Sequence, residues 1–551
     1  MINKNLPKGI LENILPKEDH VSSSLDLDSL DKILDILDPE KKFRIKDDRE
    51  ILGQLHHALN IHNYQKRDFR YLLLSNANDF DLQRFFKKIG LAEELPIDEH
   101  SKDELIQRAA NIKWDDNSET RDFIEVFGYE ENLIPVKRDI ESTSEEIQKG
   151  DDPYKQLKDF QSEVVFDALG RIENDMNARF LIQMPTGSGK TRVAMELVSY
   201  FLNANEDRNV VWLADRQELC LQAIESFKNA WPHIARKDVT LHRLWGPYNI
   251  PPKFENSNFI VAGLGKMISH FKKNQDFVIA DLIIFDEAHH MAAPEYERTV
   301  RNLSGLSTRV IGLSATPGRG YMQDKQNAEL AKLFWNNIIT IKSGNEGPIT
   351  FLQKKRILSR AEKYKIEFED PEFELTDEEW KRIASEVEFP ESVIKKLAKN
   401  YIRNLKIAEK LKELGEQKKQ VLFFGASVEH SRWMFAITKY FGYKAAHIEM
   451  DTPTSYRRDV VERFRKNEIN FIFNYDIFTA GFDAPNIDVV FIARPTKSHV
   501  TFLQMIGRGM RGPLMDGTNK FDLIYVDDRV FGNLNLDNLY EIFGDYFGER
   551  L

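Results

Sequence analysis

Short apolar runs rich in β-branched and aromatic residues alternate with longer amphipathic stretches through most of the chain after about residue 155. The runs fall at 179–183, 209–214, 259–264, 281–286 and 309–314, and again at 420–425, 444–449, 469–474, 489–494 and 521–526. Runs of this length between helical stretches are typical of parallel strands that helices cover on both faces. The pattern therefore predicts an α/β fold, with two similar domains in tandem.

The residues before this α/β region have a different pattern. Apolar positions recur at helical spacing in 27–37, 49–59 and 82–91, which predicts a mostly α-helical N-terminal domain. The segment 138–152 is polar, charged and without apolar periodicity, which is typical of a linker, and the acidic stretch 367–389 predicts a connector with a helix. The expected units are a helical accessory domain (1–150), a first α/β domain (151–345), a connector (346–395) and a second α/β domain (396–551).

The charge of the chain is unevenly distributed. The net charge is −11, and the first 150 residues hold 22 Lys and Arg against 32 Asp and Glu, which leaves 55 against 56 in the remainder. The acidity of the N-terminal domain favours a protein partner over direct contact with DNA. The near-neutral remainder is compatible with a basic groove, because phosphate contacts depend on local charge.

Cysteine content and hydropathy exclude several classes of protein. The single cysteine, Cys220, rules out a disulfide framework within the chain and a cysteine-based zinc site, and it fits a reducing cytosol. The N-terminus is polar, unlike a signal peptide, and no run approaches the roughly 18 apolar residues that span a membrane. We therefore expect a cytoplasmic protein without a membrane partner.

A glycine-rich segment, MPTGSGKT (184–191), follows one apolar run and precedes an amphipathic stretch. This context, between a strand and a helix, is that of a phosphate-binding loop, although Met184 stands where the general motif has a further glycine. A glycine-rich turn without chemistry is the alternative for this segment taken alone. The residues expected to bind a nucleotide are Thr186, Gly187, Ser188 and Gly189 through the loop backbone, Lys190 at the β- and γ-phosphates, and Thr191 through its hydroxyl on Mg²⁺.

An acidic pair provides the second half of such a site. The apolar run 282–285 ends at Asp286 and Glu287, and open parallel sheets bind ligands at the carboxyl ends of their strands. We expect Asp286 to hold Mg²⁺, directly or through water, and Glu287 to orient and deprotonate the water that attacks ATP. Helix capping by the pair is the alternative, but the position about 96 residues after Lys190 favours the chemical interpretation.

Together these segments resemble the superfamily 2 helicases of the DEAD/DEAH class, over about residues 155–530. The segments that carry the resemblance are DFQSEVV, MPTGSGKT, WLADRQEL, DEAH, LSATP, VLFFGASVEHS, FNYDIFTAGFDAPNID and TFLQMIGRGMRG, in this order. The resemblance implies two RecA-like domains that use ATP and Mg²⁺ in the cleft between them. LADRQEL, GFDAPNID, RPTKS and LQMIGRGMRG are most similar to restriction-enzyme helicase subunits and XPB-like DNA translocases, which implies DNA as the partner rather than RNA.

The resemblance also implies roles for residues outside the two ATP motifs. They are adenine sensing for Gln161, coupling of hydrolysis to domain movement for Ser314, Ala315 and Thr316, nucleotide binding for Gly481 and Asp483, and a catalytic contact for Gln504. Arg508 and Arg511 lie three residues apart, so on a helix they share a face. A guanidinium from another domain can neutralise the charge that phosphoryl transfer spreads over the γ-phosphate. We expect Arg511 to be this arginine finger and Arg508 its γ-phosphate partner.

Members of this superfamily lay one nucleic-acid strand across both domains and contact mostly its phosphates, which carry little sequence information. The candidates for this track are Arg216, Gly263, Ser427 and Thr479. Arg457 and Arg458 can add phosphate contacts, and a solvated helix face is the alternative. The sequence shows no strand-separating pin, so translocation without unwinding is an open alternative.

The N-terminal domain carries no chemical motif. His56, His57 and His62 have no aligned carboxylate or cysteine, so we expect ordinary helix residues rather than metal ligands. The segments 81–91 and 101–112 resemble the two-helix layout of DNA-binding SAP modules, and two packed amphipathic helices explain them nearly as well.

The leading hypothesis is an ATP-dependent DNA helicase or translocase, the motor subunit of a multi-protein DNA-processing or anti-phage defence system. Its N-terminal domain would dock the protein partner. We expect any nuclease to come from another polypeptide, since about 40 residues follow the last motif. The alternatives are an RNA helicase and a nucleotide-gated clamp that recruits a partner effector. A catalytically inactive scaffold is disfavoured because the catalytic residues are intact.

Overall fold

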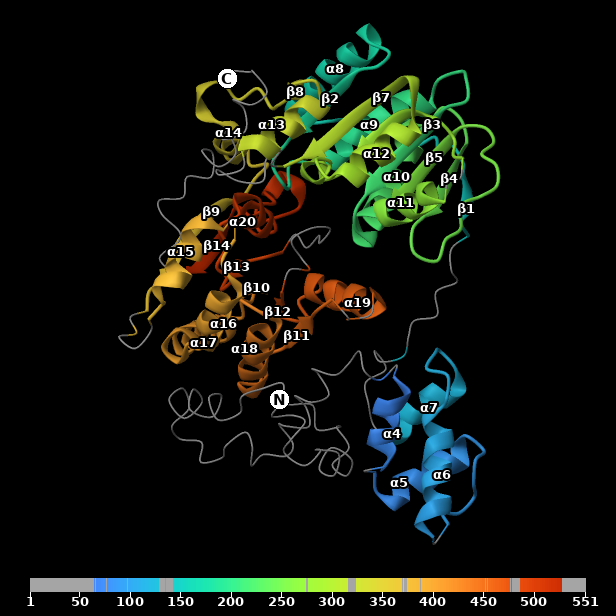
Figure 1. The fold of residues 1–551 in the computed structure, drawn as a ribbon, viewed down its shortest axis with the longest axis vertical. Coiled ribbons are helices and arrows are strands. Elements are labelled where there is room, and N and C mark those ends of the chain that lie inside the picture. The colour runs from blue at the N-terminus through green and yellow to red at the C-terminus, as the bar shows by residue number, and fades with distance from the viewer. Residues whose placement is uncertain are drawn as a thin grey trace.

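The protein divides into a helical unit and two α/β domains, as Figure 1 shows from blue through green to red. The structure is a computed structural model. It describes residues 64, 66–75, 77–96, 98–127, 142–273, 276–315, 324–368, 374–386, 388–450, 454–475 and 486–527, with the single positions 134, 370, 452 and 477.

The first α/β domain is built on an eight-stranded sheet with the strand order β1-β4-β5-β3-β6-β7-β2-β8. Its strands are β1 (Ser144–Ile147), β2 (Arg179–Gln183), β3 (Asn209–Ala214), β4 (Val239–Leu244), β5 (Asn258–Gly263), β6 (Ala280–Phe285), β7 (Ser304–Ser314) and β8 (Ile338–Ile339). Its helices are α8 (Asp159–Asn174), α9 (Lys190–Leu202), α10 (Gln217–Ile234), α11 (Leu264–Lys272), α12 (Pro294–Leu303) and α13 (Asp324–Leu333). Every strand is parallel to its neighbours except β1.

Helices cover both faces of this sheet, as the apolar runs predicted. Along β3, Val210 and Trp212 pack into the core beneath α9 and α10, whereas Val211 and Leu213 pack into the core beneath α11 and α12. Successive side chains of a strand point to opposite faces, so a strand between two helical layers must be apolar at every position. This requirement explains why the central strands were recognisable as unbroken apolar runs.

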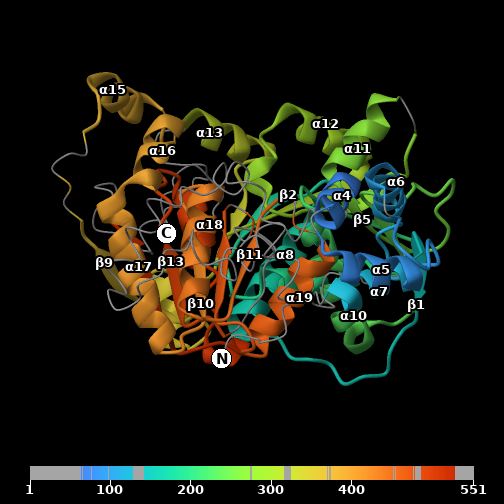
Figure 2. The same ribbon diagram turned by 90° about the horizontal axis from the view of Figure 1, so that it is seen from below.

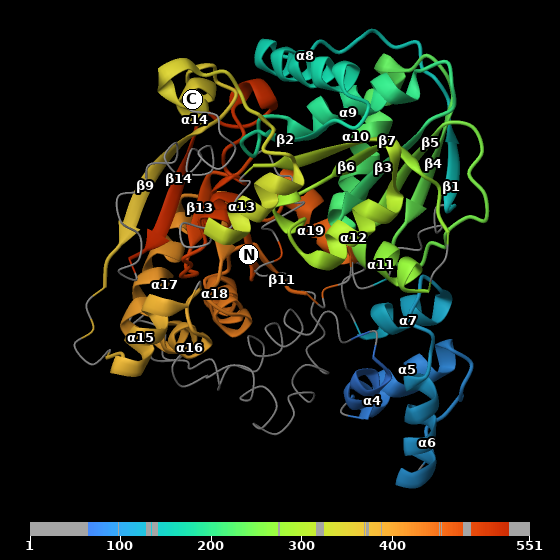
Figure 3. The same cartoon turned by 45° about the horizontal axis from the view of Figure 1, so that its top comes forward.

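The second α/β domain has a six-stranded, wholly parallel sheet with the order β11-β12-β10-β13-β14-β9 (Figures 1 and 3). Its strands are β9 (Arg360–Ile366), β10 (Val421–Phe424), β11 (Ala445–Ile448), β12 (Phe471–Asn474), β13 (Val489–Ile492) and β14 (Lys520–Val526). The helices from the connector onward are α14 (Pro348–Lys354), α15 (Asp377–Ser385), α16 (Glu391–Lys399), α17 (Tyr401–Glu416), α18 (Val428–Tyr440), α19 (Thr454–Arg465) and α20 (His499–Ile506). Both α/β domains are RecA-like, as the resemblance implied.

The N-terminal unit consists, in its described part, of α4 (Arg67–Ser75), α5 (Asp79–Lys88), α6 (Glu99–Ala110) and α7 (Ser118–Phe127) (Figure 2). Phe85 packs edge-on against Phe123 and Phe127 at the centre of its core. Helices α5 and α6 confirm the helices predicted there. The predicted helices 27–37 and 49–59, with the histidines at 56, 57 and 62, lie outside the described residues.

The predicted linker 138–152 is wrong in its second half, because β1 forms there. β1 pairs antiparallel with β4 at the edge of the first sheet. Glu145 in this strand accepts hydrogen bonds from Lys228 at 2.8 Å and from Arg243 at 2.5 Å, and Ile147 is its one apolar side chain packed against the core. An edge strand held by ion pairs has no apolar alternation, so the search for hydrophobic periodicity missed it.

The predicted connector 346–395 also contains a strand that periodicity missed. β9 joins the second sheet beside β14, so this sheet begins inside the connector. β9 is an edge strand whose side chains are mostly charged and at least partly exposed. The helix predicted in the acidic stretch 367–389 is confirmed by α15.

Among the described residues, no helix has the length and hydropathy needed to cross a membrane.

Candidate functional site

The glycine-rich loop joins β2 to α9 at the carboxyl end of the parallel strands. Gly187 and Gly189 have φ angles of 84° and 86°, in the left-handed region that favours glycine. A Cβ on Gly189 would lie 2.3 Å from Nε2 of Gln161, so a larger residue there would also displace this side chain. Gly189 is also the N-cap of α9, whose N-terminus therefore faces the loop. This arrangement is that of an anion-binding site.

Gln161 forms a hydrogen bond to the backbone of this loop. The side chain is 3% exposed, its Nε2 donates to the carbonyl of Ser188 at 2.9 Å, and its Oε1 accepts from the backbone N–H of Lys158 at 3.0 Å. The contact that the structure shows for Gln161 is therefore with the loop backbone. Its adenine-sensing role is still a prediction from the resemblance.

Asp286 and Glu287 follow directly on β6, beside the loop. Asp286 is buried, and its Oδ1 accepts from the backbone N–H of Glu287 at 3.0 Å. Glu287 has a φ of 47°, an unusual value for a residue with a side chain. Its Oε1 lies 4.0 Å from Nζ of Lys190. The lysine and the acidic pair that the sequence singled out thus meet at one point.

The environments of the two carboxylates push their pKa values apart. Burial raises the pKa of Asp286 to about 7, an effect that Lys190 opposes and the charge of Glu287 increases. Burial alone would also raise the pKa of Glu287, but the positive charges of Lys190, His289 and Arg508 outweigh it and lower this pKa. Two neighbouring acids with opposite shifts are a common basis of acid–base chemistry. Glu287 is the one held ionised, as a general base requires.

The site also fits a divalent cation. A buried carboxylate oxygen at Asp286 and the hydroxyl of Thr191 at the start of α9 are hard oxygen ligands of the kind Mg²⁺ prefers. The described residues contain no group of three or more acidic, histidine or cysteine side chains that could hold a metal. A cation bound by one carboxylate, one hydroxyl and substrate phosphates needs no such group.

The end of α20 in the second domain lies against the loop of the first. A Cβ on Gly507 would lie 2.6 Å from Cβ of Thr186, and one on Gly187 would lie 3.6 Å from the backbone nitrogen of Arg511. The charge of Arg508 also reaches Glu287, since it contributes to the lowered pKa of that carboxylate. The structure therefore brings both predicted arginines to the loop. Gln504 lies half-buried on α20.

Predicted coupling residues connect to the same loop. Ser314 ends β7, is fully buried, and accepts a hydrogen bond at its carbonyl from the N–H of Met184 at 3.1 Å. Ala315 follows and is also buried. Thr316, Thr479, Gly481 and Asp483 lie outside the described residues.

Three of the predicted track residues are helix N-caps. Arg216, Gly263 and Ser427 cap α10, α11 and α18. Arg216 and Ser427 follow the strands β3 and β10, and Gly263 is the last residue of β5. Ser427 Oγ accepts from the N–H of His430 at 3.1 Å. Helix N-termini offer backbone N–H groups to phosphates, so all three positions suit backbone contacts to a nucleic acid.

Arg457 does not belong to a solvated helix face, the alternative considered for it. Its side chain is 16% exposed, and Nη1 donates to Oε1 of Glu218 at 2.6 Å. Nε donates to the carbonyl of Thr452 at 2.9 Å and Nη2 to that of Met450 at 2.5 Å. Since Glu218 lies on α10, this ion pair joins the two α/β domains.

Two histidines that the sequence analysis did not single out lie next to the acidic pair. Nδ1 of His289 lies 3.4 Å from Oε2 of Glu287, and Nε2 of His290 lies 3.7 Å from Oδ2 of Asp215. The second contact connects the acidic motif to the segment WLADRQEL. The His-His pair directly after DEA was the signal that could have identified them.

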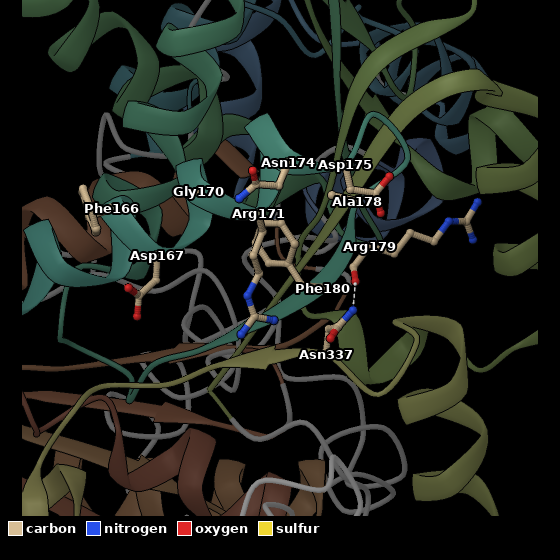
Figure 4. A pocket seen from close by; sticks show the side chains of 10 residues that line it. All are labelled: Phe166, Asp167, Gly170, Arg171, Asn174, Asp175, Ala178, Arg179, Phe180 and Asn337. Atoms are coloured by element: carbon tan, nitrogen blue, oxygen red, sulfur yellow. Dashed lines mark hydrogen bonds between the residues drawn. The ribbon is translucent and has the colours of Figure 1, made fainter.

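A cavity of about 590 Å³ opens elsewhere, along α8 and the start of β2 (Figure 4). Arg171, Arg179 and Asn337 line it, and Nδ2 of Asn337 donates to the carbonyl of Arg179 at 3.3 Å. None of the predicted site residues lines this cavity. The predicted site residues in the described part of the chain thus lie apart from this cavity.

Comparison with known proteins matches two family models in the order of the two domains. The model for the Type III restriction enzyme, res subunit, matches residues 154–319, and that for the helicase conserved C-terminal domain matches residues 404–512. These two matches support a superfamily 2 helicase. Within the superfamily it resembles restriction-enzyme helicase subunits.

The matches to individual relatives cover only part of each relative's length. The putative ATP-dependent helicase IRC3 of Saccharomyces cerevisiae is 27% identical over 366 residues, which are 64% of this chain and 49% of that protein. The ATP-dependent DNA helicase uvsW of Enterobacteria phage T4 is 22% identical over 356 residues, 64% of this chain and 65% of that protein. The chain thus spans about half to two thirds of the length of these relatives.

Two solved structures match the chain at low identity and with TM-scores below 0.5. The Hef helicase domain of Pyrococcus furiosus has a TM-score of 0.40 and 16% identity, and the match covers 68% of this chain and 96% of that one. The Type ISP restriction-modification enzyme LlaBIII bound to DNA has a TM-score of 0.48 and 15% identity, with coverage of 71% and 29%.

Proposed function

We propose that this chain is a DEAH-type ATPase that uses hydrolysis to move along a nucleic acid, with DNA as its track. The observation that carries the proposal is the meeting of two separate domains at one loop. Lys190 and Glu287 lie 4.0 Å apart in the first domain, and Arg508 of the second adds its charge to the same carboxylate. A site assembled from two domains can bind nucleotide when they close and release product when they open.

The residues of the site divide the hydrolysis reaction between them. Glu287 removes a proton from water, whose oxygen forms a bond to the γ-phosphorus as the bond to the β–γ bridging oxygen breaks, leaving ADP and phosphate. Lys190, Arg508 and Arg511 neutralise the charge that develops on the phosphate oxygens. Asp286 and Thr191 would hold Mg²⁺, which supplies further neutralisation of the phosphate charge when bound.

The choice of DNA rests on the relatives. uvsW is named as a DNA helicase, and the DNA helicase Hel308 of Methanocaldococcus jannaschii is 25% identical over 181 residues. The RNA helicase DBP3 of Meyerozyma guilliermondii is 21% identical over 335 residues, so RNA is the alternative to test. Arg216, Gly263 and Ser427 contribute helix N-termini that would contact phosphates of either polymer.

We also propose that the N-terminal unit docks a protein partner, in a DNA-processing or anti-phage defence system. The net charge of −10 over the first 150 residues supports a protein rather than a polyanion as its ligand. Phe80 on α5 is 76% exposed and offers an apolar anchor. Affinity purification from native cell extract is the test. Recovery of the chain as a stable monomer without a co-purifying protein would contradict the proposal.

Steady-state ATPase activity of the purified chain tests the motor. The activity is measured without nucleic acid and then with single-stranded DNA, double-stranded DNA or RNA, and the Lys190→Ala protein serves as the blank. We expect stimulation by DNA above that by RNA, and a preference for duplex would indicate translocation. Stimulation by RNA alone would mean that the track is RNA rather than DNA. Equal rates for wild type and blank under every condition would refute the proposed ATPase activity.

A further inference from the structure

The chain enters the second domain through a turn of fixed geometry at the end of α14. Arg356 has a φ of 58°, its N–H donates to the carbonyl of Gln353 at 3.0 Å, and the N–H of Ile357 donates to that of Leu352 at 2.9 Å. This pair of bonds is a Schellman motif, and the burial of Leu352 and Ile357 supplies the apolar contact that accompanies it. The direction of residues 357–359 is therefore set by the end of the helix.

Residues 357–359, here called the interdomain linker, form a short stretch of backbone hydrogen bonds with the loop that carries Arg511. The N–H of Ser359 donates to the carbonyl of Met510 at 2.9 Å, and the N–H of Gly512 donates to that of Ile357, also at 2.9 Å. Leu358 and Arg511 form an antiparallel bridge between the two segments. The backbone of Arg511 is thus held by the linker rather than by α20, which ends at Ile506.

The side chain of Ser359 completes this attachment. It is fully buried, and its Oγ lies 2.5 Å from the carbonyl oxygen of Arg511 and close to that of Thr518. The carbonyl of Ser359 accepts from Nε2 of Gln353, on α14, at 3.1 Å. Ser359 therefore connects the last helix before the linker to the carbonyl of the arginine.

The neighbouring linker residue lies beside the phosphate-binding loop. A Cβ on Gly187 would lie 3.4 Å from Cδ2 of Leu358 and 3.6 Å from the backbone nitrogen of Arg511. The linker therefore lies where the loop and the arginine-bearing segment meet.

We propose that Ser359 is a positioning residue for Arg511, and that through it the interdomain linker sets the reach of the arginine toward the γ-phosphate. The inference rests on the proposed ATPase function. Removing the hydroxyl leaves the carbonyl of Arg511 with the N–H of Thr518, at 3.0 Å, and so weakens one of the contacts that fix its backbone against the linker. A displacement of about 1 Å in a catalytic group can cost about 10²-fold in rate.

The variant Ser359→Ala tests this role, with Ser199→Ala as a matched control. Ser199 is also a buried serine, and its Oγ donates to the carbonyl of Met195 at 2.7 Å within α9. We expect Ser359→Ala to lower kcat about 10²-fold with the KM for ATP unchanged. It should weaken binding of ADP with aluminium fluoride, which mimics the transition state, but not of ADP alone. Ser199→Ala should change neither, although both variants lower the melting temperature to a similar extent.

A double-variant cycle with Arg511→Ala decides whether the effect passes through the arginine. If Ser359 acts only by positioning Arg511, the double variant has the kcat of Arg511→Ala alone. Multiplied losses would overturn the inference, as would an Ser359→Ala protein with wild-type kcat. Should Ser359→Ala not fold, Ser359→Cys replaces it in the same cycle. Absence of ATPase from wild type would instead overturn the proposed function, and with it the need for a positioned arginine.

Discussion

Arg457 of α19, in the second α/β domain, donates to Glu218 of α10, in the first, with 2.6 Å between Nη1 and Oε1. The guanidinium is already fixed by two carbonyls of its own domain, at Thr452 and Met450. The pair therefore forms without the full entropic cost of ordering a free arginine. The pair connects the second domain to the first within WLADRQEL (212–219), the segment expected to contact the nucleic acid.

Glu218→Gln should weaken closure of the two domains. An ion pair with partly exposed side chains, 16% and 34% here, contributes up to about 1 kcal/mol, which is about a fivefold change in the closed population. We expect the KM for ATP to rise by up to about fivefold at low salt, with wild type and variant converging at high salt as screening removes the pair. Steady-state kinetics across ionic strength measures this.

Glu297→Gln is the control for that experiment. Glu297 pairs with Arg301 at 2.6 Å within α12, so its loss leaves the interdomain contact intact. A Glu218→Gln protein that matches this control at every salt concentration would show that the pair does not assist closure.

The central strands and the contiguous motifs were predictable from the sequence for one reason. Both depend on residues that are neighbours in the chain: β3 is apolar at successive positions because both faces are covered, and the loop from Gly187 to Thr191 is one segment. All of the predicted apolar runs coincide with strands of the two sheets.

What the sequence did not reveal depends on residues far apart. β1 and β9 are edge strands with charged side chains, so no periodicity distinguished them from linkers. Glu218 and Arg457 are separated by 239 residues, and Ser359 and Arg511 by 152. A single sequence contains no signal that pairs such positions, because only the fold brings them together.

Glu287→Gln should uncouple binding from hydrolysis. The amide cannot accept the proton of the attacking water, and loss of a general base costs about 10²–10⁴-fold in rate. The lysine beside it, 4.0 Å away, is untouched, so ATP binding should be retained. Single-turnover hydrolysis and equilibrium binding of a fluorescent ATP analogue separate the two effects. A parallel loss of binding and rate, as expected for Lys190→Ala, would contradict the assignment of Glu287 as the base.

Gly189→Ala should abolish nucleotide binding. Its φ of 86° is unfavourable for alanine, and the new Cβ would lie 2.3 Å from Nε2 of Gln161, which holds the loop. Isothermal titration with ATP and with ADP tests this, and near-wild-type affinity would show that the loop tolerates displacement of Gln161.

Gly170→Ala is the matched substitution and should be stabilising. Gly170 lies inside α8, and a Cβ there meets no atom within 4 Å. Alanine is preferred to glycine in a helix interior by about 0.5–1 kcal/mol. We expect a rise in melting temperature of about 1–4 °C with unchanged nucleotide affinity.

His430 should make the second domain sensitive to mild acid. Its Nδ1 accepts from the N–H of Ala426 at 3.1 Å, and Nε2 lies 3.1 Å from Oδ1 of Asn404, so the neutral ring donates through Nε2. Burial, helped by the charge of Arg403, lowers the pKa of His430 well below its ordinary value of about 6.5. Below pH 6.5 the imidazole of His430 therefore binds a proton in the unfolded chain but stays neutral in the folded protein.

The sign of the pH effect follows from that difference. The stability contributed by neutral His430 is fully present above about pH 6.5 and is lost as the pH falls below it, at up to about 1.4 kcal/mol per pH unit. His430→Asn removes this proton uptake, so its melting temperature should be lower than that of wild type at pH 7.5 but should fall less steeply between pH 6.5 and 5. Parallel curves for the two proteins would mean that His430 is protonated in the folded state.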